Sequence, residues 1–389
     1  MATAITSPVQ RHSLQPISEI PSLDELLRKD LDYICDSLQE EFAKMSGKRL
    51  LITGGAGFLG YYLVQAVLHW NDTRSPKKRI ELTMFDNFMR GMPDWLAALE
   101  GRDDLILVRH DIRNPLPKDL ADFAYIVHAA GIASPIYYRK QPIETMDANI
   151  NGLRSLLDYC LARQKTSQPV EGFLFYSSSE IYGDPPADKI PTDEEYRGNV
   201  SCTGPRACYD ESKRYGETLC VTFYRQYGLP IKMARPFNNY GPGLKITDRR
   251  VLPDFCRDVL SGKDIVMLSD GAPTRTFCYS ADAIIGYYKV LVRGHNGEAY
   301  NVGVETPEIS MAQLAEHVVT LARDIFGYEG RVVREASAEK DYLVDNPNRR
   351  SPNILKARTQ LEYQPSVEFA DGLRRALIWY YHNQQAEDA

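Results

Sequence analysis

Two residues four positions apart, Tyr209 and Lys213, carry side chains suited to proton transfer. The residues between them favour a helix, and at this spacing both side chains lie on one helical face. An ammonium group placed there lowers the pKa of a phenol, so that the phenolate serves as a general base. We therefore expect Tyr209 to take a proton from a hydroxyl group, with Lys213 as its charged partner.

A glycine-rich segment with the spacing G-x-x-G-x-x-G follows the apolar run 49–53. Glycines in such a turn let the backbone approach a pyrophosphate, which sits at the N-terminus of the next helix. Asp86 ends the next expected strand, where a carboxylate hydrogen-bonds an adenosine ribose and repels a 2′-phosphate. The pattern predicts a dinucleotide site that prefers NAD, with NADP as the alternative because Arg90 is close in sequence. The predicted contacts are Gly54, Gly57, Phe58, Leu59, Gly60, Asp86 and Asn87.

Further cofactor contacts are expected where the third and fourth strands end. Asp111 stands where a carboxylate meets an adenine amino group, and an exposed capping residue is the alternative. Small residues after the fourth strand let a cofactor approach the backbone, whereas His128 is expected to pack within the strand. The predicted contacts from these ends are Asp111, Ile112, Ala129 and Ala130. Joined to a phenolic base, such a site indicates an enzyme that moves a hydride from an alcohol carbon to a nicotinamide.

A hydroxyl-rich turn, residues 177–180, follows the fifth expected strand. In a parallel doubly wound sheet the carboxyl ends of the strands line the ligand crevice. Ser178 is therefore placed to hydrogen-bond the reacting hydroxyl and relay its proton to Tyr209. Glu180 adds a carboxylate that serves as a second base or positions a water molecule, and a solvated polar turn is the alternative.

The elements that must position these residues alternate between strands and helices. The expected strands are 49–53, 81–86, 105–108, 123–128 and 172–177. This alternation is typical of an α/β, Rossmann-like doubly wound parallel sheet with helices on both faces. After residue 243 glycine and proline become frequent, and helices at 311–325 and 369–382 are separated by short strands. We therefore predict a nucleotide-binding domain over 46–242 and a smaller substrate domain over 243–389 that partly returns to the first.

An amphipathic helix is expected in the N-terminal extension, residues 1–45. Ser22 and Glu25 form a capping-box pattern, and apolar residues then recur at helical spacing. The apolar stripe consists of Leu23, Leu27, Leu31, Ile34, Leu38 and Phe42. We expect it to pack on its own subunit, with a dimer contact or an active-site lid as alternatives. Residues 1–20, rich in Ser, Thr, Pro and Gln, are expected to be flexible.

The composition is that of an ordinary globular protein: 389 residues, 43% hydrophobic and 25% charged, with a net charge of -6. This mild acidity gives no broad electrostatic basis for binding nucleic acid or a membrane surface. The seven cysteines include no CxxC pair, which argues against a disulfide framework or a zinc site and favours reduced thiols. With no signal peptide and no apolar run of membrane-spanning length, a cytoplasmic protein is expected.

Several motifs together resemble the extended short-chain dehydrogenase/reductase family acting on nucleotide sugars. They are the glycine turn 54–60, residues 177–183, residues 209–213 and the stretch 235–242. Ser179 stands where the 4,6-dehydratases of this family carry Asp, and Glu180 is usually lacking in the galactose-type 4-epimerases. Residues 204–214 are similar, almost residue for residue, to the UDP-glucuronate decarboxylase branch. Ser134-Pro135 with Tyr138, residues 274–277 and residues 349–354 also fit that branch.

The resemblance implies NAD-dependent decarboxylation of UDP-glucuronate through a 4-keto intermediate to UDP-xylose, by a homodimer. The implied catalytic residues are Ser178, Glu180, Tyr209, Lys213 and Arg275. The implied substrate contacts are Ser134, Pro135, Tyr138, Ser179, Arg206, Asn238, Arg250 and Arg275, and Tyr209, Lys213 and Arg235 are implied to contact NAD. For Arg275, a place near the sugar carboxylate or C5 and a place on the diphosphate stay equally open.

The sequence also departs from this branch. Ser178 stands where the decarboxylases usually have Thr, and Gly131 replaces a Ser. Two other reactions of the same site are therefore kept as alternatives: 4-epimerisation of the nucleotide sugar, and oxidative decarboxylation that releases the 4-keto pentose. A non-catalytic sensor of NAD or sugar nucleotides is a third alternative, which the set Ser178, Tyr209 and Lys213 argues against.

Overall fold

A computed structural model describes residues 14–336 and 344–383 of the chain. Its centre is a seven-stranded sheet in the order β11-β6-β5-β4-β1-β2-β3, and every neighbouring pair is parallel. The strands are β1 (Arg49–Thr53), β2 (Glu81–Asp86), β3 (Leu105–Arg109), β4 (Tyr125–His128), β5 (Gly172–Tyr176), β6 (Ile231–Pro236) and β11 (Ala299–Val302). The predicted α/β doubly wound fold is confirmed. All five residues of β5 are buried, as expected for a strand covered on both faces.

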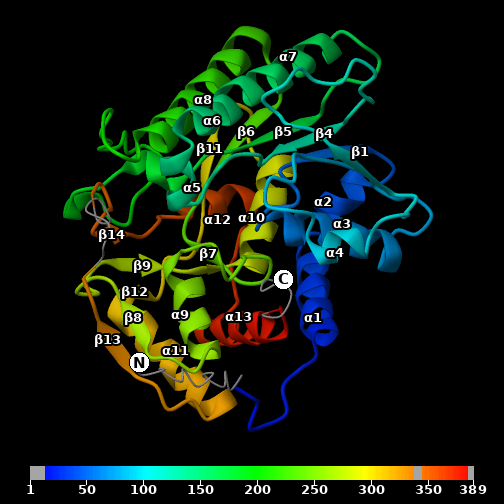
Figure 1. Ribbon diagram of the computed structural model, residues 1–389. Coiled ribbons are helices and arrows are strands. Elements are labelled where there is room, and N and C mark those ends of the chain that lie inside the picture. The colour runs from blue at the N-terminus through cyan, green and yellow to red at the C-terminus, as the bar shows by residue number, and fades with distance from the viewer. Residues whose placement is uncertain (1–13, 337–343, 384–389) are drawn as a thin grey trace, which may run out of the picture.

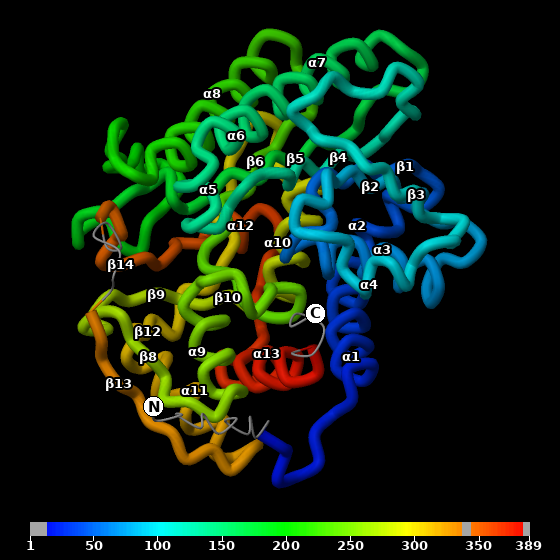
Figure 2. Tube along the Cα trace, viewed as in Figure 1, coloured from blue at the N-terminus to red at the C-terminus, as the bar shows by residue number. Residues whose placement is uncertain are grey.

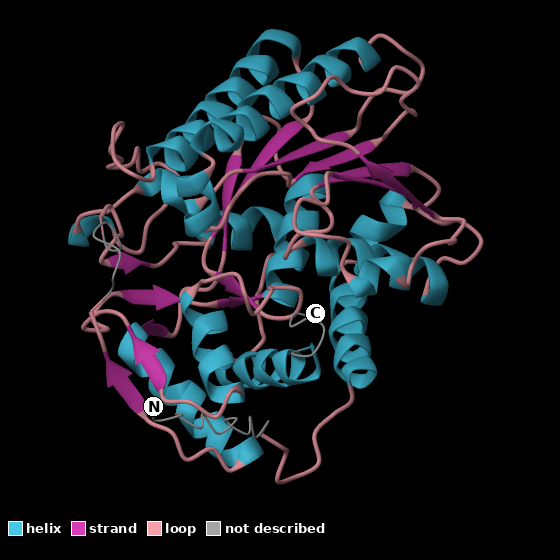
Figure 3. Cartoon of the chain, in the orientation of Figure 1, coloured by secondary structure: helices cyan, strands magenta, loops and turns pink. Residues whose placement is uncertain are grey.

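Helices form one layer on each face of this sheet (Figure 1). One layer contains α6 (Pro142–Asp147), α7 (Leu153–Arg163) and α8 (Ala207–Tyr227). The other contains α2 (Gln39–Met45), α3 (Gly60–Thr73), α10 (Ser280–Arg293) and α12 (Leu355–Leu361). The sheet lies between the two layers in Figure 3, so most of its side chains outside the edge strand β3 are shielded from water, and its strand ends are left to form a site. No described helix is long and apolar enough to cross a membrane.

The C-terminal part forms a smaller assembly beside the carboxyl end of the sheet (Figure 1). Its strands pair as β12-β9-β14, β8-β13 and β7-β10. They are β7 (Asn239–Tyr240), β8 (Ile265–Met267), β9 (Thr274–Thr276), β10 (Cys278–Tyr279), β12 (Glu308–Ser310), β13 (Val332–Arg334) and β14 (Arg349–Arg350). Its helices are α9 (Val251–Leu260), α11 (Met311–Phe326) and α13 (Phe369–Asn383). Because β11 and α10 belong to the main sheet and its covering layer, the chain after residue 243 contributes to both parts.

The N-terminal extension folds onto its own chain. α1 (Leu23–Ser37) begins with the predicted capping box, in which Ser22 and Glu25 bond each other's backbone. The inner part of the apolar stripe, including Ile34 and Phe42, is fully buried and packs with α3, α10 and α13, and Figure 2 shows α1 beside the end of α13. Residues 1–20 were expected to be flexible; in the described part of this segment the Ile17 backbone N–H donates to the Ile325 carbonyl, near the C-terminal end of α11, at 2.8 Å. Residues 1–13 lie outside the described chain.

A buried carboxylate, Asp30, fixes α1 to both parts of the molecule. Its side chain accepts hydrogen bonds from the Tyr62 hydroxyl of α3 at 2.5 Å and the Tyr279 hydroxyl of β10 at 2.6 Å. It also pairs with Arg375 of α13 at 2.5 Å. The first partner belongs to the helix that follows the glycine turn and the other two to the C-terminal part, so Asp30 connects the two.

Replacing Asp30 with Asn should lower the free energy of unfolding by about 2 kcal/mol, because hydrogen bonds to a charged group are lost in a buried site. Urea unfolding followed by far-UV circular dichroism measures the change. Asp36→Ala is the matched control: Asp36 lies on the same helix, is exposed and pairs only with Arg74 among the described residues, so a change within about 0.5 kcal/mol is expected. Equal effects of the two substitutions would contradict the proposed role of Asp30.

Candidate active site

A cavity of about 940 Å³ lies at the carboxyl ends of β1, β2, β4, β5 and β6. Ligands of open α/β sheets bind at this edge. The segments that follow these strands form one wall, and residues of the C-terminal part form the other. Its volume is in the range expected for a pocket that takes a cofactor or a small ligand.

The glycine turn opens the cavity after β1. Gly54 has a φ of +78°, and a Cβ at this position would come within 2.7 Å of the Ala130 backbone, so glycine is required for the close approach. Gly60 starts α3, and there a Cβ would collide with the Gly55 carbonyl. All the residues predicted for this turn line the cavity: Gly54, Gly57, Phe58, Leu59 and Gly60.

Asp86, at the end of β2, connects the glycine turn to the loop that follows β2. Its carboxylate accepts hydrogen bonds from the backbone N–H of Ala56 at 3.0 Å and of Phe88 at 2.8 Å, and burial raises the pKa of Asp86. Arg90, which kept NADP open in the sequence, is paired with Asp248 at 2.8 Å. Arg90, the cation near Asp86 that could bind the 2′-phosphate of NADP, therefore already has an anionic partner.

The remaining predicted cofactor contacts at the strand ends also line the cavity. They are Asn87, Asp111, Ile112, Ala129 and Ala130. The side chain of Asp111 is bound by Arg113 at 2.6 Å and by Asn87 at 3.2 Å. Hydrogen bonds from Arg113 hold the pKa of Asp111 far below its ordinary value, so this carboxylate presents a negative charge near the cavity wall.

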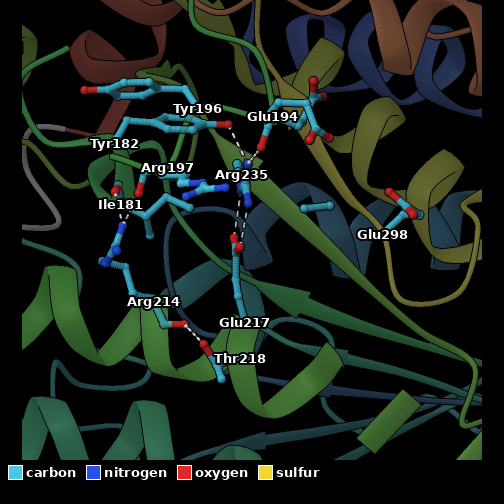
Figure 4. Close-up of polar contacts among 12 residues, drawn as sticks. Ile181, Tyr182, Glu194, Tyr196, Arg197, Arg214, Glu217, Thr218, Arg235 and Glu298 are labelled. Carbon is cyan, nitrogen blue, oxygen red and sulfur yellow. Dashed lines mark hydrogen bonds and ion pairs between the residues drawn. The ribbon is translucent and has the colours of Figure 1, made fainter. Parts of the chain in front are cut away.

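Arg235 is the exception, because it is not among the described residues that line the cavity. Figure 4 shows its guanidinium between Glu217 of α8 and the segment that carries Tyr182 and Glu194. It forms two hydrogen bonds with Glu217, at 2.8 and 2.6 Å, and donates to the Tyr182 hydroxyl and the Glu194 carbonyl, each at 2.8 Å. The prediction that Arg235 contacts NAD is therefore corrected. The guanidinium pairs with Glu217 on helix α8 and points away from the cavity.

α8 brings Tyr209 and Lys213 to the cavity one helical turn apart, as their spacing predicted. The Lys213 ammonium lies 5.8 Å from the centre of the Tyr209 ring and donates to the Tyr176 carbonyl at 2.7 Å. Ser178 follows β5 and lies close enough to Tyr209 for its hydroxyl to lower the pKa of the phenol. The residues predicted to transfer the proton are thus brought together from one helix and one strand end.

The electrostatics of this set differ from the expectation. Burial raises the pKa of Tyr209 to about 12, and the hydrogen bond with Ser178 and the charge of Arg250 oppose that rise. Burial also lowers the pKa of Lys213 to about 7. The pKa of Tyr209 is therefore raised, opposite to the lowering predicted from the spacing with Lys213, because desolvation of the buried phenolate is the largest influence on it.

Glu180 lies in the 3₁₀ turn η2 (Ser179–Tyr182) and is bound by two arginines. Arg350 of β14 donates to its carboxylate at 2.7 Å, and Arg206 forms a second, short ion pair with it. Burial acts to raise the pKa of Glu180, but the two guanidinium groups outweigh burial and hold the pKa below its ordinary value. Glu180 is therefore ionised and fixed, which rules out the solvated turn considered from the sequence.

Arg275 of β9 presents a guanidinium whose partners are all neutral. It donates to the carbonyls of Thr274 at 2.7 Å, Pro347 at 2.6 Å and Asn348 at 3.3 Å. No carboxylate lies within ion-pair distance of it in residues 14–336 and 344–383, yet it is buried and lines the cavity. Burial lowers the pKa of Arg275 to about 9. Such a charge fits an anionic group of a ligand.

The other predicted substrate residues meet at the same cavity. They are Ser134, Pro135, Tyr138, Ser179, Arg206, Asn238 and Arg250. Tyr138, on α5 (Pro135–Lys140), stacks on Tyr209 with ring centres 5.2 Å apart and planes 13° apart. This contact holds the phenol ring of Tyr209 in one orientation within the pocket.

Sequence reasoning missed Arg350 as a site residue. The segment 349–354 was recognised as a motif, but no role followed from it. In the structure β14 pairs in parallel with β9, which sets Arg350 opposite Arg275 and brings it to Glu180. The doublet Arg349-Arg350 was the available signal, but its partner strand is decided by tertiary packing.

Comparisons with known proteins agree with this geometry. Residues 50–303 match the NAD dependent epimerase/dehydratase family. UDP-glucuronic acid decarboxylase 5 of Arabidopsis thaliana is 36% identical over 84% of this chain and 88% of its own length. UDP-glucuronic acid decarboxylase 1 of Xenopus tropicalis is 33% identical over 86% of this chain and 72% of its own length.

Among solved structures, DesIV, a dTDP-glucose 4,6-dehydratase from Streptomyces venezuelae solved with NAD bound, has a TM-score of 0.73 and 26% identity. It covers 87% of this chain and 98% of its own. The UDP-glucuronic acid 4-epimerase of Bacillus cereus, with a TM-score of 0.68 and 24% identity over 86% of this chain and 99% of its own, shows the same fold. With its glycine turn, its carboxylate after β2 and its Tyr209–Lys213 pair, the chain belongs to the NAD dependent epimerase/dehydratase family, whose cofactor is NAD.

Proposed function

We propose that this protein decarboxylates UDP-glucuronate to UDP-xylose through a 4-keto intermediate, with NAD as cofactor. The observation that carries the proposal is Arg275, a buried cation with neutral partners that lines the same cavity as Tyr209 and Ser178. A sugar carboxylate would form an ion pair with the Arg275 guanidinium, whereas a neutral hexose has no anionic group to pair with it. The relatives in Arabidopsis thaliana and Xenopus tropicalis support the same reaction class.

The first step is oxidation at C4 of the sugar. Ser178 hydrogen-bonds the C4 hydroxyl, and the Tyr209 oxygen accepts the proton, while Tyr138 keeps the phenol ring in place. NAD, when bound, supplies the hydride acceptor at C4 and later the hydride donor, and its cationic ring favours the phenolate. When Lys213 is protonated, its positive charge stabilises the phenolate form of Tyr209.

The second step breaks the bond between C5 and C6. The 4-keto sugar is a β-keto acid, so the electron pair of that bond passes into an enolate over C5 and C4 as carbon dioxide leaves. C5 then takes a proton from solvent, and Tyr209 returns the first proton to the C4 oxygen as the ketone is reduced back to the alcohol. One proton from solvent is consumed for each carbon dioxide released, and Glu180 with Arg206 and Arg350 forms the fixed polar wall at this end of the cavity.

Arg275 is assigned to the sugar carboxylate because it lines the cavity opposite Arg350 on the neighbouring strand, and the partner of Arg350 is already Glu180. Arg275→Leu should lower kcat/KM for UDP-glucuronate by about 100-fold, comparable with the loss of one aligned charge donor, and leave the Kd for UDP within about twofold. Steady-state kinetics and calorimetry of UDP binding measure the two effects. A large loss of UDP affinity would instead assign Arg275 to the diphosphate.

Product analysis tests the reaction itself. Purified protein is incubated with UDP-glucuronate and NAD, and the products are identified by mass spectrometry and proton NMR. Loss of carbon dioxide without net accumulation of reduced cofactor supports the proposal. A product of unchanged mass identifies a 4-epimerase, stoichiometric reduced cofactor identifies an oxidative decarboxylase, and binding without turnover identifies a sensor.

We also infer a homodimer, the assembly that the family resemblance implies. Helix α8 exposes three aromatic residues, Tyr215, Tyr224 and Tyr227, each between 36% and 50% exposed, and tyrosine is enriched in protein–protein interfaces. A second copy of this chain is the proposed partner. Light scattering coupled to size-exclusion chromatography should give a molar mass twice that of one chain. Tyr215→Lys should lower this mass toward that of a single chain. A monomeric wild-type protein would contradict the inference.

A further inference from the structure

Arg90 forms a bridge between two segments of the cavity wall that are far apart in sequence. It lies in the loop after β2, and its Nη1 donates to Asp248, in the segment between β7 and α9, at 2.8 Å. Its guanidinium also lies 5.1 Å from the centre of the Tyr137 ring on α5. The Lys245 ammonium donates to the Arg90 carbonyl at 3.1 Å. These four residues are among those that line the cavity.

The charges around this bridge affect how strongly the neighbouring Arg250 can attract an anion. Asp248 is 3% exposed and pairs with both Arg90, at 2.8 Å, and Arg250, at 3.1 Å. One buried carboxylate is thus shared by two guanidinium groups, so these three groups together carry one net positive charge. Without Arg90, Asp248 would neutralise Arg250, and the attraction for an anion at this place would weaken, although Lys245 and Arg249 also line the cavity.

The position of Arg90 connects this charge to the cofactor end of the cavity. Arg90 follows Asp86 by four residues, and Asp86 bonds both the glycine turn and the backbone of the same loop. On the other side, Asp248 is fixed by the Ser134 hydroxyl, which donates to its carbonyl at 3.0 Å. The bridge therefore joins the segment that receives the adenosine ribose of NAD to the segment that carries Arg250.

We propose that the bridge from Arg90 to Asp248 makes NAD and the diphosphate of the nucleotide sugar bind cooperatively, with Arg90 as a positioning residue. This rests on the proposed function, in which Arg250 meets the diphosphate. The bridge is already formed in the structure; a cofactor bound beside Asp86 would favour this arrangement of the loop, in which Arg90 holds Asp248 and Arg250 is left for the anion. A coupling of this kind is reciprocal, so the diphosphate strengthens NAD binding by the same factor.

The test measures the Kd of UDP by calorimetry on the full chain stripped of nucleotide, with and without saturating NAD. In the wild type NAD should lower the Kd of UDP at least about fivefold, the lower end of typical coupling between sites. In Arg90→Ala the factor should fall below about twofold. Arg90→Lys should restore part of it, because Lys keeps the charge but not the fork geometry.

Arg109→Ala is the matched control, since Arg109 contacts Phe88 of the same loop, with 5.7 Å to the ring centre, but is not one of the described cavity residues. It should keep the wild-type factor. Uridine, which has no diphosphate, should bind equally to wild type and Arg90→Ala. The inference is overturned if NAD and UDP bind and Arg90→Ala keeps the wild-type factor, or if the wild type shows no coupling. If UDP does not bind the wild type at all, the proposed function fails with it.

Discussion

Tyr209→Phe should lower kcat for UDP-glucuronate about 1000-fold, within the usual range for loss of a positioned acid–base group. The substitution removes one oxygen and keeps the ring that stacks on Tyr138, so the fold and both binding sites should persist. Rapid mixing with detection of the reduced nicotinamide isolates the oxidation step, and calorimetry shows whether NAD and UDP still bind.

Tyr224→Phe is the control for Tyr209→Phe. It removes a hydroxyl from the same helix α8 at a position that is 36% exposed, and kcat should stay within about twofold of wild type. If Tyr209→Phe kept its rate within about tenfold while NAD and UDP bound normally, Tyr209 would not be the base. Another group in the cavity would then have to take the C4 proton.

Arg235→Met should lower the free energy of unfolding by about 3–5 kcal/mol, the usual cost of leaving one partner of a buried ion pair alone. The group left behind is Glu217, which makes two hydrogen bonds to Arg235 in a site where Arg235 is 9% exposed. The Tyr182 hydroxyl also loses its donor from Arg235. Because Tyr182 ends the turn that carries Glu180, kcat should fall as well, and urea unfolding with steady-state kinetics measures both effects.

Arg235→Met also tests whether Arg235 supports the fold or contacts NAD. If Arg235 is part of the scaffold, the folded variant should bind NAD within about threefold of wild type. Arg235→Met combined with Glu217→Leu should regain part of the lost stability, since no unpaired carboxylate remains buried. A variant of normal stability that bound NAD more than about tenfold more weakly would restore the original prediction for Arg235.

Local patterns predicted the parts of the site that depend on neighbouring residues. The spacing of Tyr209 and Lys213 placed both on one face of α8, and the glycine turn was predicted at the end of β1. The capping box at Ser22 also formed as expected. These features arise from contacts within one helix turn or one strand–turn–helix unit, so composition and spacing are sufficient to predict them.

Contacts between distant segments were not predictable in this way. Arg350 reaches Glu180 across 170 positions of the chain, and Asp30 reaches Arg375 across 345. No periodicity in the sequence indicates which short strand pairs with β9 or which helix covers α1. Arg235 shows the same limit, because its motif suggested a ligand contact and a carboxylate on α8 took the side chain instead.

By itself the sequence determined the fold class and the NAD cofactor, and it predicted Tyr209 as the phenolic base, because the patterns behind these conclusions are short runs of residues with fixed spacing. Only the tertiary structure decided the charge balance of the cavity. Whether an arginine faces a carboxylate, as Arg350 does, or neutral carbonyls, as Arg275 does, depends on which distant segment packs beside it. Burial, which raises the pKa of Tyr209, is likewise set by the assembled layers and not by its neighbours in sequence.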